Sequence, residues 1–163
     1  MSTEPIEPQL FRSVMGHFPT GVTAVTALDE GEPVGMTVGS FTSVSLDPPL
    51  VAFLPGRHSR TWARIRHAGS FCVNVLTCEQ LELCSALATN HDDKFGAITW
   101  HTAISGSPVI DGALAWIDCA IDAVHPAGDH DIVVGRVLAL QADVAALSGP
   151  LLFFRGGYGR FSP

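Results

Sequence analysis

The sequence contains few cations and few charges of either sign. Lys and Arg number 9 against 16 Asp and Glu, so the net charge is −7, and only 15% of the 163 residues are charged. Because nucleic acids and anionic membrane surfaces are bound largely through clustered cations, this balance disfavours both kinds of partner. Apolar residues reach 47%, a content that excludes intrinsic disorder for the chain as a whole.

Long hydrophobic runs are also missing. No apolar run approaches the roughly 20 residues that a membrane-spanning helix needs. The first ten residues, MSTEPIEPQL, carry acids where a signal peptide carries bases, and they lack an apolar centre. We therefore expect a cytoplasmic protein without membrane association. Residues 1–7 are expected to form a flexible tail, and residues 8–163 a single domain.

The four cysteines lack the spacing of a zinc or disulfide site. None belongs to a CxxC pair, and Cys72, Cys84 and Cys119 lie in apolar surroundings. Free Cys packs as a small hydrophobic residue, so buried, reduced thiols are expected. A redox-active Cys78, near the start of a predicted helix, is the less favoured alternative. No other cluster has metal-ligand spacing, so no metal site is predicted.

Three common catalytic or binding motifs are absent as well. The sequence has no GxGxxG after a strand, no GxxxxGK[ST] loop and no GxSxG elbow. A bound dinucleotide would therefore not be held by a Rossmann fingerprint. A Ser-His-Asp hydrolase of the usual strand–turn–helix kind would lack its nucleophile elbow.

Hydrophobic patterning predicts a mainly β protein with few helices. Strands come as hairpins and do not alternate with helices, which favours a closed antiparallel β-barrel with peripheral helices over a doubly wound sheet. Helices are expected over residues 10–18 and 59–68 and after the capping-box pair Thr77 and Gln80, and residues 89–113 are expected to be irregular. The expected strands cover residues 22–28, 34–39, 50–54 (buried on both faces), 71–76, 114–124, 132–142 and 151–155, with a mixed segment at 40–46 and a turn at 126–129.

Four of the eight arginines lie within residues 57–66, where a strand leads into a helix. Ser59 is placed to cap that helix, Thr61 lies in its first turn, and Arg57 precedes both. Free backbone N–H groups, hydroxyls and arginines converge there, which suits a phosphate monoester. A capped helix with a solvated basic face has equal weight from the pattern alone.

Residues 36–45 hold five hydroxyl side chains and no charge. A neutral heteroaromatic ring needs backbone and hydroxyl groups at its polar edges and apolar atoms at its faces. Gly39 would let the backbone approach such a ring closely. On the pattern alone, a Ser- and Thr-rich edge strand is the favoured interpretation.

Two loops carry the remaining candidates. His130 lies between Asp129 and Asp131 in a turn that contains glycine, and both acids would favour its imidazolium form. Lys94, the only lysine, stands beside Phe95. Each pattern by itself is more typical of a solvated surface loop.

Together, these segments resemble the flavin reductase-like family, small FMN-binding split barrels that supply reduced flavin to two-component monooxygenases. The hydroxyl-rich motif that ends in DPPL is the most specific part of the resemblance, which runs from Phe11 to Phe161. Its elements stand in family order: FPTGV at 18–22, GMTVGSFTSVSLDPPL at 35–50, HSRT at 58–61, DKF at 93–95, GDH at 128–130 and FRGGY at 154–158.

The resemblance implies an NAD(P)H:flavin oxidoreductase. It would reduce FMN or FAD with NADH or NADPH, form a homodimer, and serve a partner flavin-dependent monooxygenase. His130 would sit by the nicotinamide, as a positioning or proton-donating group. A pyridoxamine-phosphate-oxidase-like enzyme on the same barrel and a non-enzymatic flavin sensor or carrier are the alternatives. The residues expected to bind or border the flavin are Met36, Thr37, Val38, Gly39, Ser40, Phe41, Arg57, Ser59, Thr61, Lys94, Phe95 and Tyr158.

Overall fold

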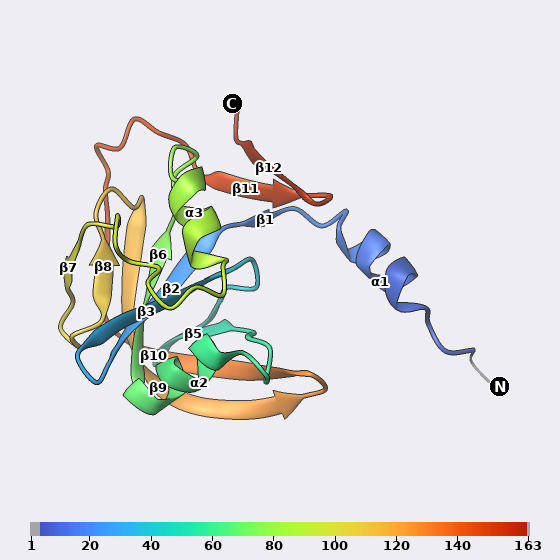
Figure 1. Cartoon of the computed structure of the whole chain (residues 1–163), viewed down its shortest axis with the longest axis horizontal. Coiled ribbons are helices and arrows are strands. Elements are labelled where there is room, and N and C mark those ends of the chain that lie inside the picture. Colours follow the sequence, from blue (N-terminus) through green and yellow to red (C-terminus); the bar gives the residue numbers. More distant parts are fainter. Residues whose placement is uncertain (1–3, 163) are drawn as a thin grey trace.

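A seven-stranded antiparallel sheet forms the body of the protein in the computed structural model, which describes residues 4–162 (Figure 1). Residues 1–3 of the expected tail, and Pro163, lie outside the described residues. The strand order is β3-β2-β6-β9-β10-β5-β4, and all pairs are antiparallel, as predicted. These strands are β2 (Thr23–Asp29), β3 (Glu32–Val38), β4 (Thr42–Leu46), β5 (Pro49–Phe53), β6 (Ser70–Val75), β9 (Ala115–Ala127) and β10 (His130–Ala142).

Two smaller sheets complete the β structure. One has the order β1 (Thr20–Gly21), β11 (Leu151–Phe154) and β12 (Gly157–Arg160), and the other pairs β7 (Trp100–Thr102) with β8 (Pro108–Ile110). The β7–β8 hairpin corrects the expectation that residues 89–113 are wholly irregular. These strands are too short for a period-two pattern, and a tertiary contact fixes the second one: the Ile110 N–H donates to Asn74 Oδ1 at 2.8 Å.

The core consists of two apolar clusters. The first lies under α2 (Arg60–Ala68), where Phe53 packs edge-to-face against Trp62 and Phe71. The second lies under α3 (Leu81–Leu87) and includes Leu76 and Leu87. Both clusters pack against the same sheet, so each helix is held in place beside it.

Three of the four cysteines are buried, as predicted. Cys72, Cys84 and Cys119 are buried, Cys78 is half-buried, and all four are free thiols. Burial raises the pKa of the Cys72 thiol strongly and that of Cys119 to about 12. Thiols with such pKa values stay protonated and inert at neutral pH.

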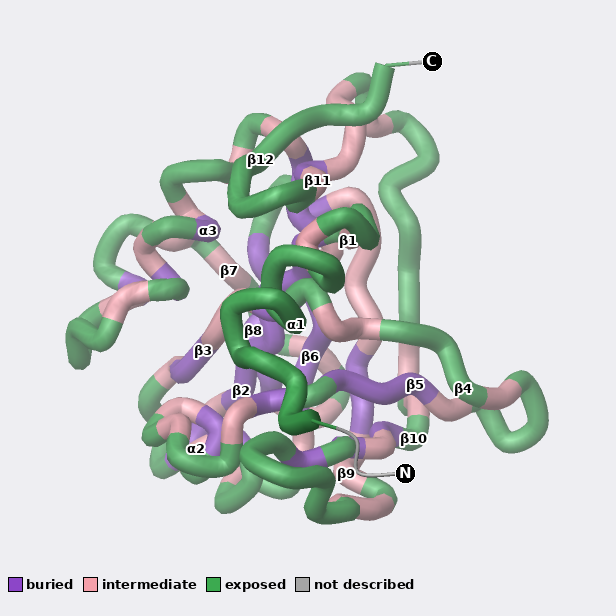
Figure 2. Tube along the Cα trace, turned by 90° about the vertical axis from the view of Figure 1, so that its right-hand side faces the viewer, coloured by how far each residue is buried: buried purple, intermediate pink, exposed green. Residues whose placement is uncertain are grey.

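The outer elements differ from the sequence prediction in their limits. Helix α1 (Pro8–Met15) begins at a proline and ends before Gly16, so residues 16–18 are not helical. It extends from the body of the molecule, and none of its residues is buried (Figures 1 and 2). Leu54 lies outside β5 and is exposed, and only the last three residues of that strand, Val51, Ala52 and Phe53, are buried. No helix within residues 4–162 combines the length and the apolar character that crossing a membrane requires.

Candidate functional site

The start of helix α2 is built as its sequence predicts. Ser59 is the N-cap residue, with extended backbone angles, and its Oγ accepts a hydrogen bond from the Trp62 N–H at 3.1 Å. The helix ends at Gly69, whose positive φ of 77° provides the left-handed C-cap. The first backbone N–H groups of a helix have no partner within the helix, so those of Arg60 and Thr61 add to the positive end of its dipole.

Lys94 joins three elements beside this helix start. Its Nζ donates to the Gly35 carbonyl at 3.3 Å, to Thr61 Oγ1 at 3.3 Å and to the Leu87 carbonyl at 3.1 Å. Partial burial and the nearby charge of Arg60 lower the pKa of Lys94. Among residues 4–162, no carboxylate forms an ion pair with Lys94 or Arg60. The site therefore holds positive charge that a bound anion would balance.

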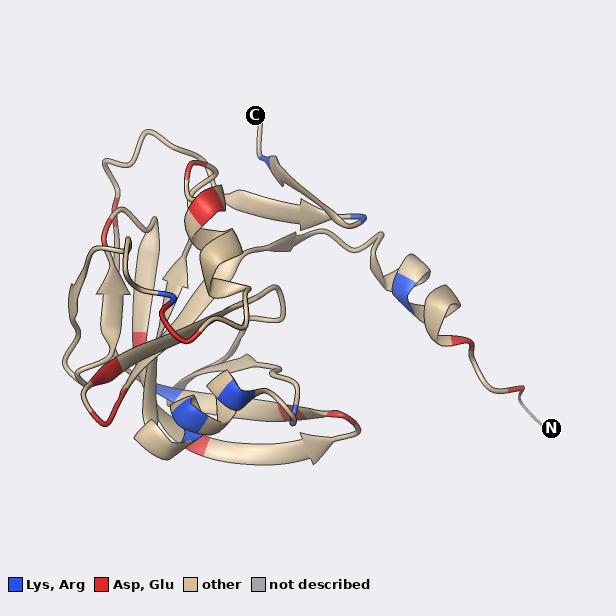
Figure 3. Ribbon diagram, viewed as in Figure 1, with Lys and Arg blue, Asp and Glu red and all other residues tan. Residues whose placement is uncertain are grey.

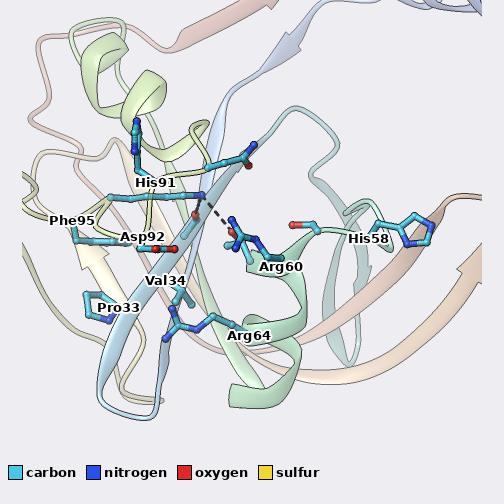
Figure 4. A pocket seen from close by; sticks show the side chains of 13 residues that line it. Pro33, Val34, His58, Arg60, Arg64, His91, Asp92 and Phe95 are labelled. Atoms are coloured by element: carbon cyan, nitrogen blue, oxygen red, sulfur yellow. Dashed lines mark hydrogen bonds between the residues drawn. The ribbon is translucent and has the colours of Figure 1, made fainter.

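A cavity of about 480 Å³ opens at this point, and we call it the α2 cavity (Figure 4). Its lining contains hydroxyl, cationic and imidazole side chains, and the one acidic residue in the lining is Asp92. Figure 3 marks basic residues in blue along α2 and in the loop after α3 that carries Lys94. This chemistry fits a phosphate group. The lining residues are Pro33, Val34, Gly35, His58, Ser59, Arg60, Thr61, Arg64, Asn90, His91, Asp92, Lys94 and Phe95.

Arg64 is held in the cavity wall by a buried acid. Its Nε donates to Asp29 Oδ2 at 2.8 Å, and His67 Nδ1 lies 2.7 Å from Asp29 Oδ1. The hydrogen bonds with His67 and Arg64 lower the pKa of Asp29, and the hydrogen bond with Asp29 raises the pKa of His67. Sequence reasoning missed Arg60 and Arg64 as lining residues. Their spacing of four, which puts both on one helix face, could have found them.

Strand alternation divides the residues expected at the flavin ring. On β3, Val34, Met36 and Val38 pack with the first core cluster. Gly35 and Thr37 share the opposite face, where a Cβ on Gly35 would lie 3.1 Å from Phe95 Cζ. Only the backbone of Met36 and Val38 is therefore free to meet a ligand on the Lys94 side.

A second cavity, of about 530 Å³, lies at the other end of β3, and we call it the Gly39 cavity. Gly39, Ser40 and Phe41 line it together with Phe18 and Thr20. A Cβ on Gly39 would lie 2.8 Å from Thr20 Oγ1, so a larger residue at this position would have to displace the Thr20 side chain. Seven of the predicted residues therefore line one of the two cavities, whereas Met36, Thr37 and Val38 line neither. Ser59, Thr61, Lys94 and Phe95 line the α2 cavity, and Gly39–Phe41 line the Gly39 cavity.

The turn between β9 and β10 presents His130 to solvent. His130 Nδ1 lies 2.6 Å from Asp129 Oδ1, and this hydrogen bond lowers the pKa of Asp129. The expectation that both neighbouring acids flank the imidazole is wrong. Side chains alternate along β10, so Asp131 points inward, where it accepts a hydrogen bond from Trp62 Nε1 at 2.8 Å.

Arg57 lies at this turn and does not line the α2 cavity. Its backbone N–H donates to the Asp129 carbonyl at 2.9 Å, its Nη1 donates to the Gly128 carbonyl at 3.4 Å, and its Nε lies 3.5 Å from Asp131 Oδ1. The arginine that precedes the helix cap therefore stabilises the turn that carries His130.

Tyr158 also lies outside the lining of both cavities. Its hydroxyl accepts a hydrogen bond from Cys84 Sγ at 3.6 Å, and its ring packs edge-to-face against Phe153. The hydrogen bond with Cys84, together with burial, raises the pKa of Tyr158.

Within residues 4–162, no three metal-ligating side chains come together.

A comparison with protein families identifies a family that shares this sequence. The family described as the flavin reductase like domain matches residues 15–162. The chain belongs to the flavin reductase-like family. This membership confirms the resemblance carried by the sequence motifs and identifies the antiparallel barrel as the split barrel of that family.

Relatives in the flavin reductase-like family include both named reductases and reductase subunits. The flavin reductase of Pseudomonas putida is 54% identical over 158 residues, which cover 96% of this chain and 92% of the relative. HsaB of Rhodococcus jostii, the reductase subunit of a flavin-dependent monooxygenase, is 45% identical over 163 residues, which cover 100% of this chain and 83% of the relative. The solved NADH:FAD oxidoreductase SgcE6 of Streptomyces globisporus superposes with a TM-score of 0.90 at 37% identity, and the match covers 100% of both chains.

Proposed function

We propose that this chain is an NAD(P)H-dependent flavin reductase that supplies reduced flavin to a partner monooxygenase. The observation that carries the proposal is the α2 cavity, in which Lys94 and Arg60 form no ion pair within residues 4–162, in a chain of the flavin reductase-like family. Its relatives include a flavin reductase and a monooxygenase reductase subunit.

Ser59, Thr61 and Lys94 are proposed to hold the flavin phosphate. Thr61 and Lys94 already share a hydrogen bond, and the Ser59 hydroxyl lies at the positive end of the α2 dipole. The backbone of β3 around Thr37, together with Gly39 and Ser40, would border the ring. A bound flavin supplies the chemistry itself, since it accepts a hydride from a reduced nicotinamide. The chain's task is to orient the two rings and exclude competing reactions.

His130 is proposed to position the nicotinamide. Its exposed imidazole is oriented by Asp129, and the turn that carries it is tied to the loop before α2 through Arg57. Hydride transfer needs no side-chain nucleophile, which agrees with the absence of a nucleophile elbow from the sequence.

We further propose that the protein is a cytoplasmic homodimer. Helix α1 exposes Leu10, Phe11, Val14 and Met15, and no part of it is buried against its own chain. A contiguous apolar face of this kind is typical of a surface covered by a partner. The oxidation of NAD(P)H supports the cytoplasmic assignment, since that is where this reductant is at hand for a reductase and its oxygenase.

Steady-state oxidation of NADH and of NADPH, with FMN and FAD in turn, tests the proposed function. We expect rapid oxidation of at least one nicotinamide that depends on added flavin and yields a reduced flavin that reacts with oxygen. Tight retention of flavin without NAD(P)H oxidation would instead identify a carrier or sensor. Oxidation of pyridoxamine phosphate would identify the other enzyme class.

A further inference from the structure

The turn that carries His130 is fixed to the loop between β5 and α2. The Asp131 N–H donates to the Pro55 carbonyl at 3.0 Å, and the Arg57 N–H donates to the Asp129 carbonyl at 2.9 Å. These two bonds lie on either side of His130, which itself forms an isolated antiparallel bridge with the same loop. The backbone of His130 therefore keeps a set position relative to the loop that leads into α2, where the flavin phosphate is proposed to bind.

The side chain of Arg57 strengthens this connection at two points. Its Nη1 donates to the Gly128 carbonyl at 3.4 Å, and its Nε lies 3.5 Å from Asp131 Oδ1. Gly128 has a positive φ of 65° within the turn, and Asp131 is the second residue of β10. Because a guanidinium holds its N–H donors in one rigid plane, a single side chain can fix these two places relative to each other.

Asp131 gives Arg57 a partner that is itself anchored. The Asp131 side chain is only 7% exposed, and its Oδ2 accepts a hydrogen bond from Trp62 Nε1 at 2.8 Å. Trp62 is buried in the first core cluster and belongs to the first turn of α2. A buried carboxylate needs such partners to offset its loss of water. The contacts of Arg57 thus run from the His130 turn, through Asp131, into the same turn of α2 that carries Thr61.

We propose that Arg57 and Asp131 are positioning residues for the nicotinamide, and that Arg57 does not bind the flavin phosphate. Together they hold the turn of residues 128–130 in an arrangement that places the His130 imidazole beside a flavin bound at the start of α2. The inference rests on the proposed function, which assigns the nicotinamide to His130. A turn that is already ordered loses less conformational freedom when the dinucleotide binds, so the pair lowers the Michaelis constant of NAD(P)H without touching it.

The first experiment measures the dissociation constant of FMN by fluorescence titration, and the Michaelis constant and turnover with FMN as acceptor. The donor is NADH or NADPH, whichever the wild-type protein oxidises faster. Arg57→Gln removes the guanidinium, and Asp131→Asn removes its charged partner while keeping an oxygen for Trp62. Each variant should raise the Michaelis constant of the donor about fivefold, and leave turnover at saturation and the FMN constant within twofold of wild type.

Arg66→Gln is the matched control for both variants. Arg66 Nη1 lies 4.0 Å from Asp131 Oδ2, so this change removes a positive charge near the same carboxylate. The charge is taken from α2, however, and not from the loop that holds the His130 turn. All three constants of Arg66→Gln should stay within twofold of wild type.

A double variant tests whether the pair acts through His130. If Arg57 only holds the turn, its loss has no further effect on the dinucleotide once the imidazole is gone. We therefore expect the Michaelis constant of Arg57→Gln/His130→Ala to lie within twofold of that of His130→Ala. A merely structural role would act alike in both backgrounds and give an additive effect.

Three results would overturn the positioning role. Weaker FMN binding in Arg57→Gln would return Arg57 to the flavin phosphate. A Michaelis constant that rises by the same factor with and without His130 would mean that Arg57 touches the dinucleotide directly or acts only on the fold. An unchanged Michaelis constant in either single variant would separate the pair from the reaction. Arg57→Gln keeps the test decisive if Asp131→Asn fails to fold, because Arg57 lies in a loop and its side chain is half exposed.

The wild-type protein distinguishes this failure from failure of the proposed function. Oxidation of NAD(P)H that depends on added flavin would leave the reductase function standing whatever the variants show. Absence of that oxidation in wild type would overturn both the proposed function and the positioning role.

Discussion

At the scale of single residues, Thr61 has the most direct link to flavin binding. Its hydroxyl accepts a hydrogen bond from Lys94 at the mouth of the α2 cavity. Thr61→Val keeps the shape of the side chain but removes this polar group. We expect FMN affinity to fall by about 1.5–3 kcal/mol, the usual contribution of a charge-assisted hydrogen bond. Fluorescence titration with FMN measures the loss.

Riboflavin, which lacks the phosphate, is the ligand control for Thr61→Val, and its affinity should hardly change. Thr102→Val is the protein control, since it removes a hydroxyl from exposed β7. An equal loss for FMN and riboflavin would remove Thr61 from the phosphate site.

His130 tests a different part of the proposed site. If its imidazole only positions the dinucleotide, His130→Ala should raise the Michaelis constant of NAD(P)H and leave turnover at saturation nearly unchanged, because the contact is equal in ground and transition states. If it donates a proton, turnover should fall by roughly a hundredfold. We expect the first result, since hydride transfer does not demand a side-chain acid.

Flavin affinity and the variant His125→Ala are the controls for this experiment. His125 is an exposed histidine near the other end of the same hairpin loop and pairs in register with Ile132. Both His variants should bind flavin as wild type does. Unchanged kinetic constants in His130→Ala would show that this turn has no part in the reaction.

At the scale of secondary-structure elements, α2 is anchored to β2 by the Asp29–His67 pair. The pKa of His67 is raised above 6.5 by Asp29, so its stabilising effect is complete below that value and fades as pH rises through the raised pKa. The pKa of Asp29 is lowered below 3.8, so the effect also fades as pH falls through that lowered pKa. The pair should therefore stabilise α2 most in mildly acidic solution.

Thermal unfolding of His67→Gln against wild type measures this dependence. We expect the difference in Tm to be larger at pH 5.5 than at pH 9, and to shrink again near pH 3. His125→Gln, a change of the same kind on exposed β9, should show no such trend. A difference in Tm that is constant across this range would mean that the pair does not anchor the helix.

Elements and local caps were predictable from the sequence, but the direction of individual side chains was not. Ser59 has the sequence context of an N-cap and is one. Arg57 lies two residues earlier, in a loop, where no periodicity fixes direction, and it contacts the β9–β10 turn. Asp131 follows His130 in the sequence and is therefore expected to act on its imidazole. Side chains alternate along the strand, however, so Asp131 points toward Trp62 instead. The motif residues were recognised, while the partners that hold them depend on tertiary contacts that one sequence does not contain.

At the scale of the whole molecule, exposed apolar residues lie on α1 and on the sheet formed by β1, β11 and β12. Phe11 and Phe18 are 57% and 70% exposed. Phe154, the last residue of β11, and Phe161, which follows β12, are exposed as well. Phe18 also lines the Gly39 cavity, so whatever covers this surface lies next to the proposed ring site. Covering it with a second copy would bring the partner's surface to the open side of that cavity.

The proposed homodimer predicts the mass of the particle in solution, and it predicts that a charge in the apolar face of α1 will weaken the dimer. Light scattering at micromolar concentration should report twice 17.3 kDa, and a particle of 17.3 kDa would contradict the proposal. Phe11→Asp places a charge in the apolar face of α1, where burial against a partner would desolvate it, and should shift the protein to the monomer. Ser13→Asp adds the same charge two residues away, outside the apolar stripe of the helix, and should stay dimeric. Equal masses for the two variants would mean that α1 covers some surface other than a second copy. The apolar face of α1 has no partner within the described chain, so loss of the dimer should expose it. If the ring site borders the dimer interface, Phe11→Asp should also bind flavin more weakly than Ser13→Asp does.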